Sequence, residues 1–111
     1  PANRVFRKGH EYADILIHGI LEHQSQIDET LRQFSEKWDL GRMAIVDRNI
    51  MRVAVYEMLF VPDVPPVVSI NEAVGIARDY SGEKSGNFIN GVLNGIKDTL
   101  KRPARDAVKE L

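Results

Sequence analysis

The sequence predicts an all-α domain, and three observations support that prediction. Apolar residues recur every three or four positions through most of the 111-residue chain, which is the period of an amphipathic helix. No segment shows the strict apolar–polar alternation of a half-buried strand. Proline and the Ser81-Gly82 pair stand between the periodic segments, where they end helices. The length suits one core, so we expect residues 1–111 to form a single domain.

Five helices follow in order along the chain. The predicted ranges are 8–23, 25–38, 44–61, 69–80 and 83–101. The first two are divided at Ser25, because Ser25 and Asp28 have the spacing of a helix N-terminal capping pair. Ser69 and Glu72 form the corresponding pair at the start of the fourth helix. Gly82 ends that helix, and the fifth begins directly afterwards.

The third predicted helix is central to the core, because little of its surface is polar. Arg48, Asn49 and Arg52 share one narrow stripe at helical spacing, whereas Glu57 falls among apolar residues. A carboxylate in such a position costs several kcal/mol unless it is paired or hydrogen-bonded. Two interpretations of Glu57 stay open: it bridges a neighbouring element within the core, or it faces a binding partner.

The fifth predicted helix has an unusual composition. Its run from 85 to 94 contains Gly and Asn at positions between the apolar residues. Each Gly costs a helix roughly 1 kcal/mol relative to Ala. Residues that break a local rule in this way often mark function or close contact. We therefore expect Gly91 and Gly95 to admit a neighbouring helix.

The composition argues against several classes of protein. Fifteen basic and sixteen acidic residues give a net charge of −1, which lacks the basic excess of a non-specific nucleic-acid binder. The absence of cysteine rules out thiol chemistry and is typical of a reducing cytoplasm. No phosphate loop, dinucleotide fingerprint or nucleophile elbow occurs, so we predict no enzyme and no cofactor. No apolar stretch reaches the roughly 18 residues of a membrane span.

One polar series has the spacing of a metal site. His10, Asp14, His18 and Glu22 recur every four residues and could present imidazoles and carboxylates on one helix face, as zinc requires. No HExxH motif and no second ligand cluster follows. We therefore favour a solvated polar face and predict no metal.

A series of motifs in the middle and at the end of the chain points to a known family. The motifs are Lys37-Trp38-x-Leu40-x-Arg42, Val46-Asp47-Arg48-Asn49-Ile50-x-Arg52-x-Ala54-x-Tyr56-Glu57-x-Leu59, Pro65, Ile70-Asn71-Glu72-Ala73-Val74 and Phe88-Ile89-Asn90-Gly91-Val92-Leu93. In these motifs the chain resembles the NusB transcription antitermination factors over about residues 12–96. The resemblance implies a compact all-α fold of two helical subdomains, without catalysis.

The resemblance also implies a function. NusB-type factors bind RNA together with the small-subunit ribosomal protein NusE. The pair recognises the boxA element of nascent RNA and joins an antitermination complex on RNA polymerase, which supports ribosomal RNA transcription in the cytoplasm. Two alternatives stay open. One is the NusB-like RNA-binding domain of a ribosomal RNA cytosine methyltransferase, and the other is a structural module that forms homodimers.

The resemblance assigns RNA-binding residues near the start of the fifth helix. Phe88 matches a family aromatic residue near which RNA bases lie, although ordinary core packing would also explain it. Asn87 and Lys84 flank this position, and Lys84 stands where some relatives carry an acidic residue. Tyr80 matches another frequent aromatic residue.

The resemblance places the protein partner at the start of the third helix. Asp47 matches an acidic position that faces the ribosomal protein, and Arg48 beside it is assigned to the same surface. A carboxylate in the first turn of a helix is also favoured by the helix dipole, so a purely structural role remains open for Asp47.

The N-terminal region departs from the family pattern. Family members usually begin with an arginine-rich helix and a second helix before the segment that matches 10–22. Here only nine residues precede that segment, and we expect a family member that lacks its first two helices. Arg4, Arg7 and Lys8 are the basic residues that remain for RNA binding.

Overall fold

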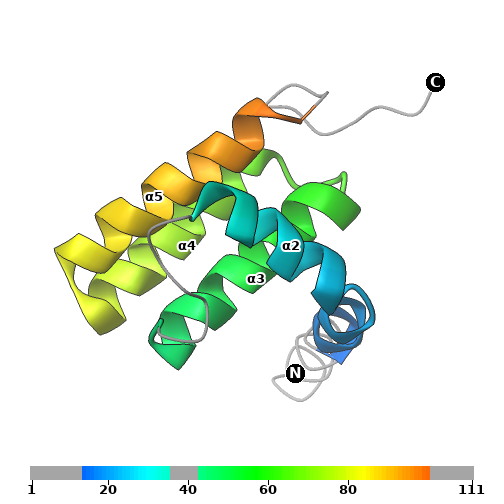
Figure 1. Cartoon of the computed structure of the whole chain (residues 1–111), viewed down its shortest axis with the longest axis horizontal. Helices are drawn as coiled ribbons and strands as arrows, with labels where there is room; N and C mark the ends of the chain where they lie inside the picture. The colour runs from blue at the N-terminus through cyan, green and yellow to red at the C-terminus, as the bar shows by residue number, and fades with distance from the viewer. Residues whose placement is uncertain (1–13, 36–42, 101–111) are drawn as a thin grey trace, which may run out of the picture.

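The computed structural model describes residues 14–35 and 43–100, and every regular element among them is a helix. A helical segment at 14–22, here called the leading segment, precedes four longer helices. These are α2 (Gln24–Phe34), α3 (Ile45–Phe60), α4 (Pro66–Ser81) and α5 (Glu83–Asp98), as Figure 1 shows. The all-α prediction is therefore confirmed.

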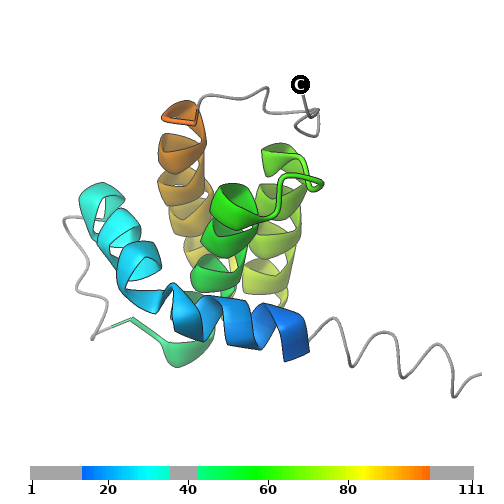
Figure 2. The ribbon, with the colours of Figure 1, turned by 90° about the vertical axis from the view of Figure 1, so that its right-hand side faces the viewer.

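The helices form one packed unit around α3. Helices α4 and α5 lie side by side and run in opposite directions, because a single residue connects them (Figure 1). Helix α3 contacts α2, α4 and α5. The leading segment lies crosswise to α3, α4 and α5 (Figure 2). This arrangement brings the start of α3 close to the turn between α4 and α5.

The core takes one apolar stripe from each helix. Its fully buried large side chains include Ile27, Leu31, Met51, Val55, Ile89, Leu93 and Ile96. Their spacing within each helix is three or four residues, as the hydrophobic period predicts. The buried side chains of α2, α3, α4 and α5 meet in a single cluster.

The start of α2 corrects one prediction. Helix α2 begins at Gln24, and His23 precedes it without a side-chain capping hydrogen bond. Asp28 is buried and accepts two hydrogen bonds from Arg52 of α3, with both N–O distances at 2.8 Å. The predicted capping pair of Ser25 and Asp28 is wrong, because a long-range ion pair takes the carboxylate away from the helix terminus.

The start of α4 corrects another prediction, the capping box at Ser69. Helix α4 begins at Pro66, three residues before the predicted start. Pro65 is extended and Pro66 occupies the first helical position, where its fixed φ and missing N–H cost nothing. Ser69 lies buried inside the helix and does not cap it, so the predicted capping box with Glu72 is wrong.

The other helix ranges agree more closely with prediction. Helix α3 lies within one residue of the predicted 44–61, and α5 starts at the predicted residue and ends at Asp98. Helix α2 ends at Phe34, whereas the prediction extended to 38; residues 36–42 lie outside the described part. The first predicted helix is described from residue 14.

The two glycines of α5 behave differently. A Cβ atom on Gly95 would lie 2.9 Å from the Phe34 ring, so the absence of a side chain at Gly95 lets α2 pack closely against α5, as predicted. Gly91 is exposed, and a Cβ atom there would meet nothing within 4 Å. The packing role predicted for Gly91 is therefore wrong.

Candidate functional site

Gly82 makes the sharp turn that joins α4 to α5. Its φ of 96° and ψ of 177° fall in a region that is essentially restricted to glycine. Its N–H donates to the Arg78 carbonyl at 3.1 Å, and its carbonyl accepts from the Gly86 N–H at 3.1 Å. One residue thus ends α4 and begins α5, which holds the two helix ends close together.

The residues assigned to RNA by resemblance lie around this turn. Tyr80 is 78% exposed at the end of α4. Lys84 and Asn87 are exposed on the first turns of α5. Phe88 is half-buried and packs against the hydrophobic core. Core packing therefore accounts for part of the Phe88 side chain, while the remainder stays accessible beside Asn87.

Arg78 is a member of this surface that the sequence analysis missed. Its aliphatic chain passes over Gly86 of α5, where a Cβ atom would clash with it. Its Nη2 donates to Asn87 Oδ1 at 3.4 Å, which places the cation beside an assigned RNA residue. The sequence signal was Gly86 directly before Asn87, because a missing side chain leaves room for a neighbour.

Asp47 connects the start of α3 to the same turn. Ser81 Oγ donates to Asp47 Oδ1 at 2.8 Å, and Ser85 Oγ donates to Asp47 Oδ2 at 3.0 Å. Arg48, next along α3, is half-buried. The residues assigned to the protein partner and those assigned to RNA are therefore neighbours, although about forty positions separate them in sequence.

The charge of this surface is close to balance. The residues around the turn include three cations, Arg48, Arg78 and Lys84, and three carboxylates, Asp47, Asp79 and Glu83. Phosphate contacts at this surface would therefore be few and local, since no broad basic patch surrounds them. The remaining basic candidates, Arg4, Arg7 and Lys8, lie outside the described residues.

The polar series considered for metal binding is only partly described. Asp14, His18 and Glu22 are exposed on the leading segment, and His10 lies outside the described residues. Across 14–35 and 43–100, no group of three His, Cys, Asp or Glu residues is arranged to hold a metal ion. Within those same ranges no helix is long and apolar enough to cross a membrane.

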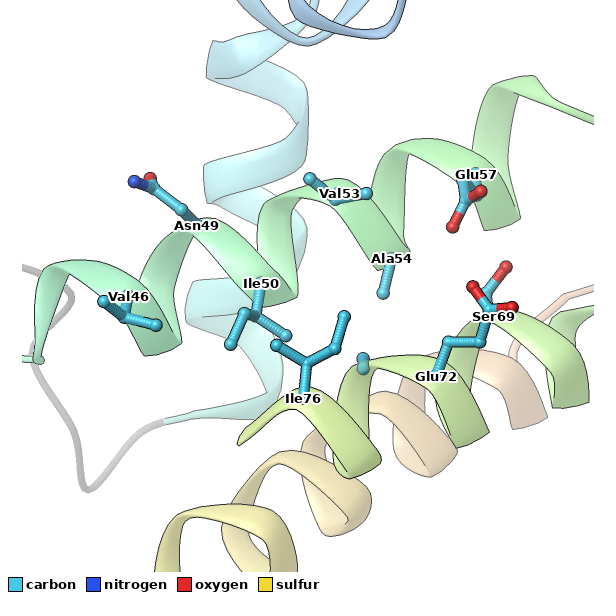
Figure 3. Close-up of a pocket in the computed structure, with 10 residues that line it drawn as sticks. Val46, Asn49, Ile50, Val53, Ala54, Glu57, Ser69, Glu72 and Ile76 are labelled. Atoms are coloured by element: carbon cyan, nitrogen blue, oxygen red, sulfur yellow. The ribbon is translucent and has the colours of Figure 1, made fainter. Parts of the chain in front are cut away.

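Glu57 lines a groove between α3 and α4. Figure 3 shows its carboxyl near Ser69 and Glu72, at one end of a largely apolar cavity of about 360 Å³. The other lining residues include Val46, Ile50, Val53, Ala54 and Ile76. Glu57 is half-buried, so its carboxyl lies at the rim of the groove rather than inside the closed core.

The groove changes the titration of Glu57. Burial raises the pKa of the Glu57 carboxyl above its ordinary value, and the neighbouring Glu72 charge raises it further. Ser69 Oγ lies close enough to lower the pKa in part. The Ser69 hydroxyl is buried and makes no hydrogen bond of good geometry within the described residues. It therefore stabilises the charged form of Glu57 only in part.

The fold is that of a small all-helical domain, with aromatic and amide side chains exposed at the α4–α5 turn. The model of the NusB family matches residues 2–98 of this chain. The chain belongs to the NusB family. The family identification made from the motifs is therefore confirmed.

Individual relatives agree with this assignment. The transcription antitermination protein NusB of Bacillus cereus strain B4264 is 51% identical over 90 residues, covering 81% of this chain and 69% of that protein. The NusB of Bacillus thuringiensis strain Al Hakam is equally similar. These relatives are transcription antitermination proteins by name.

Solved structures show the same fold. T. maritima NusB has a TM-score of 0.78 and 46% identity, covering 83% of this chain and 65% of that chain. A chain in the crystal structure of a plectonemic RNA supercoil has a TM-score of 0.75 and 31% identity, covering 82% of this chain and 66% of that one. The chain thus spans about two thirds of the length of the solved relatives it matches.

Proposed function

We propose that this protein is a transcription antitermination factor that binds boxA-type RNA together with the ribosomal protein NusE. It would act in the cytoplasm, in an antitermination complex on RNA polymerase that supports ribosomal RNA transcription. Family membership supports this function in general terms. The observation that carries it is the surface at the α4–α5 turn, where Tyr80, Lys84, Asn87 and Phe88 gather beside Asp47.

The chemistry of this surface suits single-stranded RNA. The Tyr80 ring and the accessible part of Phe88 offer faces for base stacking, which is typically worth about 1–3 kcal/mol per base. The Asn87 amide can hydrogen-bond the edge of an unstacked base. Lys84 and Arg78 can each contact a phosphate. These groups favour splayed bases over a double helix, because stacking needs free base faces.

The nearly balanced charge supports a role for a partner in RNA binding. With a net charge of −1 and few cations at the turn, the chain alone attracts RNA weakly over long range. A second protein bound beside Asp47 and Arg48 would lie next to the RNA surface and extend it. NusE fits that role, since the family resemblance assigns it to this side of α3.

A titration tests the proposal directly. Fluorescently labelled boxA RNA is titrated with the protein in the presence and absence of NusE, and anisotropy reports binding. We expect weak binding alone and clearly tighter binding with NusE. A scrambled RNA of the same length is the control and should not gain from NusE. Equal affinities with and without NusE would contradict the proposal.

Nothing among the described residues favours the methyltransferase alternative over antitermination, and the named relatives are antitermination proteins. Homodimerisation is a second candidate function with an observation of its own. The apolar groove between α3 and α4 shares Asn49 and Val53 with a second hollow that Ile17 and Leu21 line. Contiguous exposed apolar surface of this kind is unusual on a monomer, and a second copy of the chain would cover it.

Light scattering over a range of concentrations tests the dimer. We expect the mass to approach twice that of the 12.6 kDa chain as concentration rises. A Leu21→Glu variant should stay monomeric, because Leu21 is 62% exposed on this face and its replacement leaves the core intact. A monomer at all concentrations would contradict the second candidate and leave the first unaffected.

A further inference from the structure

Asp47 spans the α4–α5 turn with its two carboxylate oxygens. Ser81 is the last residue of α4 and Ser85 is the third residue of α5, so the two hydroxyls stand on either side of Gly82. Each donates to a different oxygen of the same carboxylate, at 2.8 and 3.0 Å. The carboxylate therefore ties both helix ends to α3.

The start of α5 is otherwise held by the backbone hydrogen bonds of Gly82 and by the longer Arg78–Asn87 hydrogen bond of 3.4 Å. Gly82 has no side chain, and no side-chain capping hydrogen bond satisfies the first N–H groups of α5. Uncapped helix ends fray, and glycine gains more freedom than other residues when a turn loosens. Lys84 and Asn87 lie within the first turns of α5, so fraying there would disperse the RNA surface.

We infer that Asp47 is a positioning residue for RNA binding: through Ser81 and Ser85 it holds the α4–α5 turn in the conformation that presents Lys84, Asn87 and Phe88. The inference rests on the proposed function for its RNA readout. It differs from the assignment of Asp47 to direct partner contact. A partner that binds at the start of α3 acts on the same carboxylate, so RNA and partner binding are coupled through it.

Two simpler roles for Asp47 make different predictions. If Asp47 acts only as a negative charge near RNA phosphates, any replacement that removes the charge should tighten RNA binding. If it acts only on the α3 dipole, Asn and Ala replacements should have equal effects. The positioning role separates Asn from Ala, because the Asn Oδ1 can accept from one serine while its Nδ2 donates to the other.

The experiment compares Asp47→Asn, Asp47→Ala and the double variant Ser81→Ala/Ser85→Ala. RNA affinity is measured by anisotropy with boxA RNA, and amide hydrogen exchange of 83–88 is measured on the RNA-free protein. Asp63→Ala, an exposed carboxylate in the connection between α3 and α4, controls for loss of charge. Circular dichroism checks that each variant is helical.

We expect Asp47→Ala and the serine double variant each to weaken RNA binding about tenfold or more, because each removes both hydrogen bonds to the carboxylate. Both should accelerate exchange at the start of α5, whereas Asp47→Asn should stay within about twofold of the wild type in affinity. The triple variant Asp47→Ala/Ser81→Ala/Ser85→Ala should bind RNA as strongly as Asp47→Ala alone, because all three changes remove the same two hydrogen bonds.

The two readouts separate failure of the inference from failure of the proposed function. Equal effects of Asn and Ala, additive effects, or unchanged exchange in Asp47→Ala would overturn the positioning role. If the wild type does not bind boxA RNA even with NusE, the proposed function fails, while exchange still tests whether Asp47 holds the turn. Should Asp47→Ala not fold, the serine double variant carries the same test.

Discussion

At the residue scale, the position of Phe88 is compatible with both roles that the sequence left open, core packing and base stacking. Its ring packs against the core, and it is only half-buried beside the exposed Asn87. An aromatic ring anchored in this way can stack on a base without the entropy cost of ordering a free side chain. Core packing would thus give rigidity to the proposed RNA surface.

Phe88→Leu separates stacking from packing. Leucine keeps an apolar side chain of similar reach in the core, so we expect a small change in thermal midpoint, corresponding to less than about 1.5 kcal/mol. RNA affinity should fall about tenfold, because the aromatic face is lost. Anisotropy and a thermal melt measure the two effects. Unchanged RNA affinity would mean that Phe88 serves packing alone.

Gly82→Ala tests the backbone of the turn. The observed φ of 96° with ψ of 177° is strained for any residue with a Cβ, so we expect a loss of about 1–3 kcal/mol in the free energy of unfolding. Gly91→Ala is the matched control, since Gly91 is exposed within α5 and a Cβ atom there would meet nothing within 4 Å. It should stabilise by about 0.5–1 kcal/mol. Urea denaturation measures the free energy of unfolding of both variants. Changes of the same sign in the two variants would contradict the backbone role of Gly82.

At the scale of elements, contacts between helices override local sequence signals. Asp28 pairs with Arg52 and joins α2 to α3, rather than capping α2. Asp47 joins α3 to both α4 and α5. Glu57 and Glu72 bring two carboxylates to one end of the α3–α4 groove, where burial disfavours the charge of Glu57. The Asp28 and Asp47 contacts stabilise the packing of the helices, whereas the Glu57 carboxyl makes the stability of the fold depend on pH.

Glu57→Gln should reveal that pH dependence. The pKa of a Glu carboxyl lies near 4.5 in the unfolded chain, and folding raises that of Glu57. Between these two values the folded state binds more protons, so stability falls as pH rises through this window. We therefore expect Glu57→Gln to raise the thermal midpoint at pH 7.

The gain from Glu57→Gln should shrink toward pH 4, where the wild-type carboxyl is protonated in both states. Solvent screening of the half-buried carboxyl keeps the gain small. Thermal melts across pH measure it, and Glu22→Gln on the exposed leading segment is the control. A pH-independent difference between Glu57→Gln and the wild type would refute this explanation.

At the scale of the whole molecule, the number of phosphates that the protein contacts sets how RNA binding responds to salt. Each phosphate neutralised on a single strand contributes about −0.7 to the slope of log affinity against log salt. If Arg78 and Lys84 alone contact phosphate, the slope is about −1.4, and with Arg4, Arg7 and Lys8 it approaches about −3.5. We expect the steeper value, because all three N-terminal residues are assigned to RNA.

Replacing Arg4, Arg7 and Lys8 together by alanine should return the slope to about −1.4. Arg32→Ala, an exposed cation on α2 that is not assigned to RNA, should leave it unchanged. Titrations at several salt concentrations give both slopes. A wild-type slope already near the shallow value would remove the three N-terminal residues from the RNA surface.

Much of the fold followed from local patterns. The boundaries of α3 were predictable to within a residue, because Pro62 stops a helix that is apolar on most sides. The start of α4 was not, because two valid start signals, Pro66 and Ser69, compete within one turn. The motifs identified the family and hence the residues of the candidate site. The position of Arg78 in this surface could not be predicted from the sequence, because it depends on the space above Gly86 that the packing of α4 against α5 creates.

The sequence by itself determined the helical class, the apolar stripes and the family, because hydrophobic periodicity and the order of motifs can be read along the chain without knowledge of its tertiary contacts. Only the tertiary structure decided which polar groups meet. Asp47 lies 34 and 38 residues from the serines that it binds, and Asp28 lies 24 residues from Arg52. Such pairs form when packed helices bring distant positions within hydrogen-bonding distance, and no local pattern records that distance.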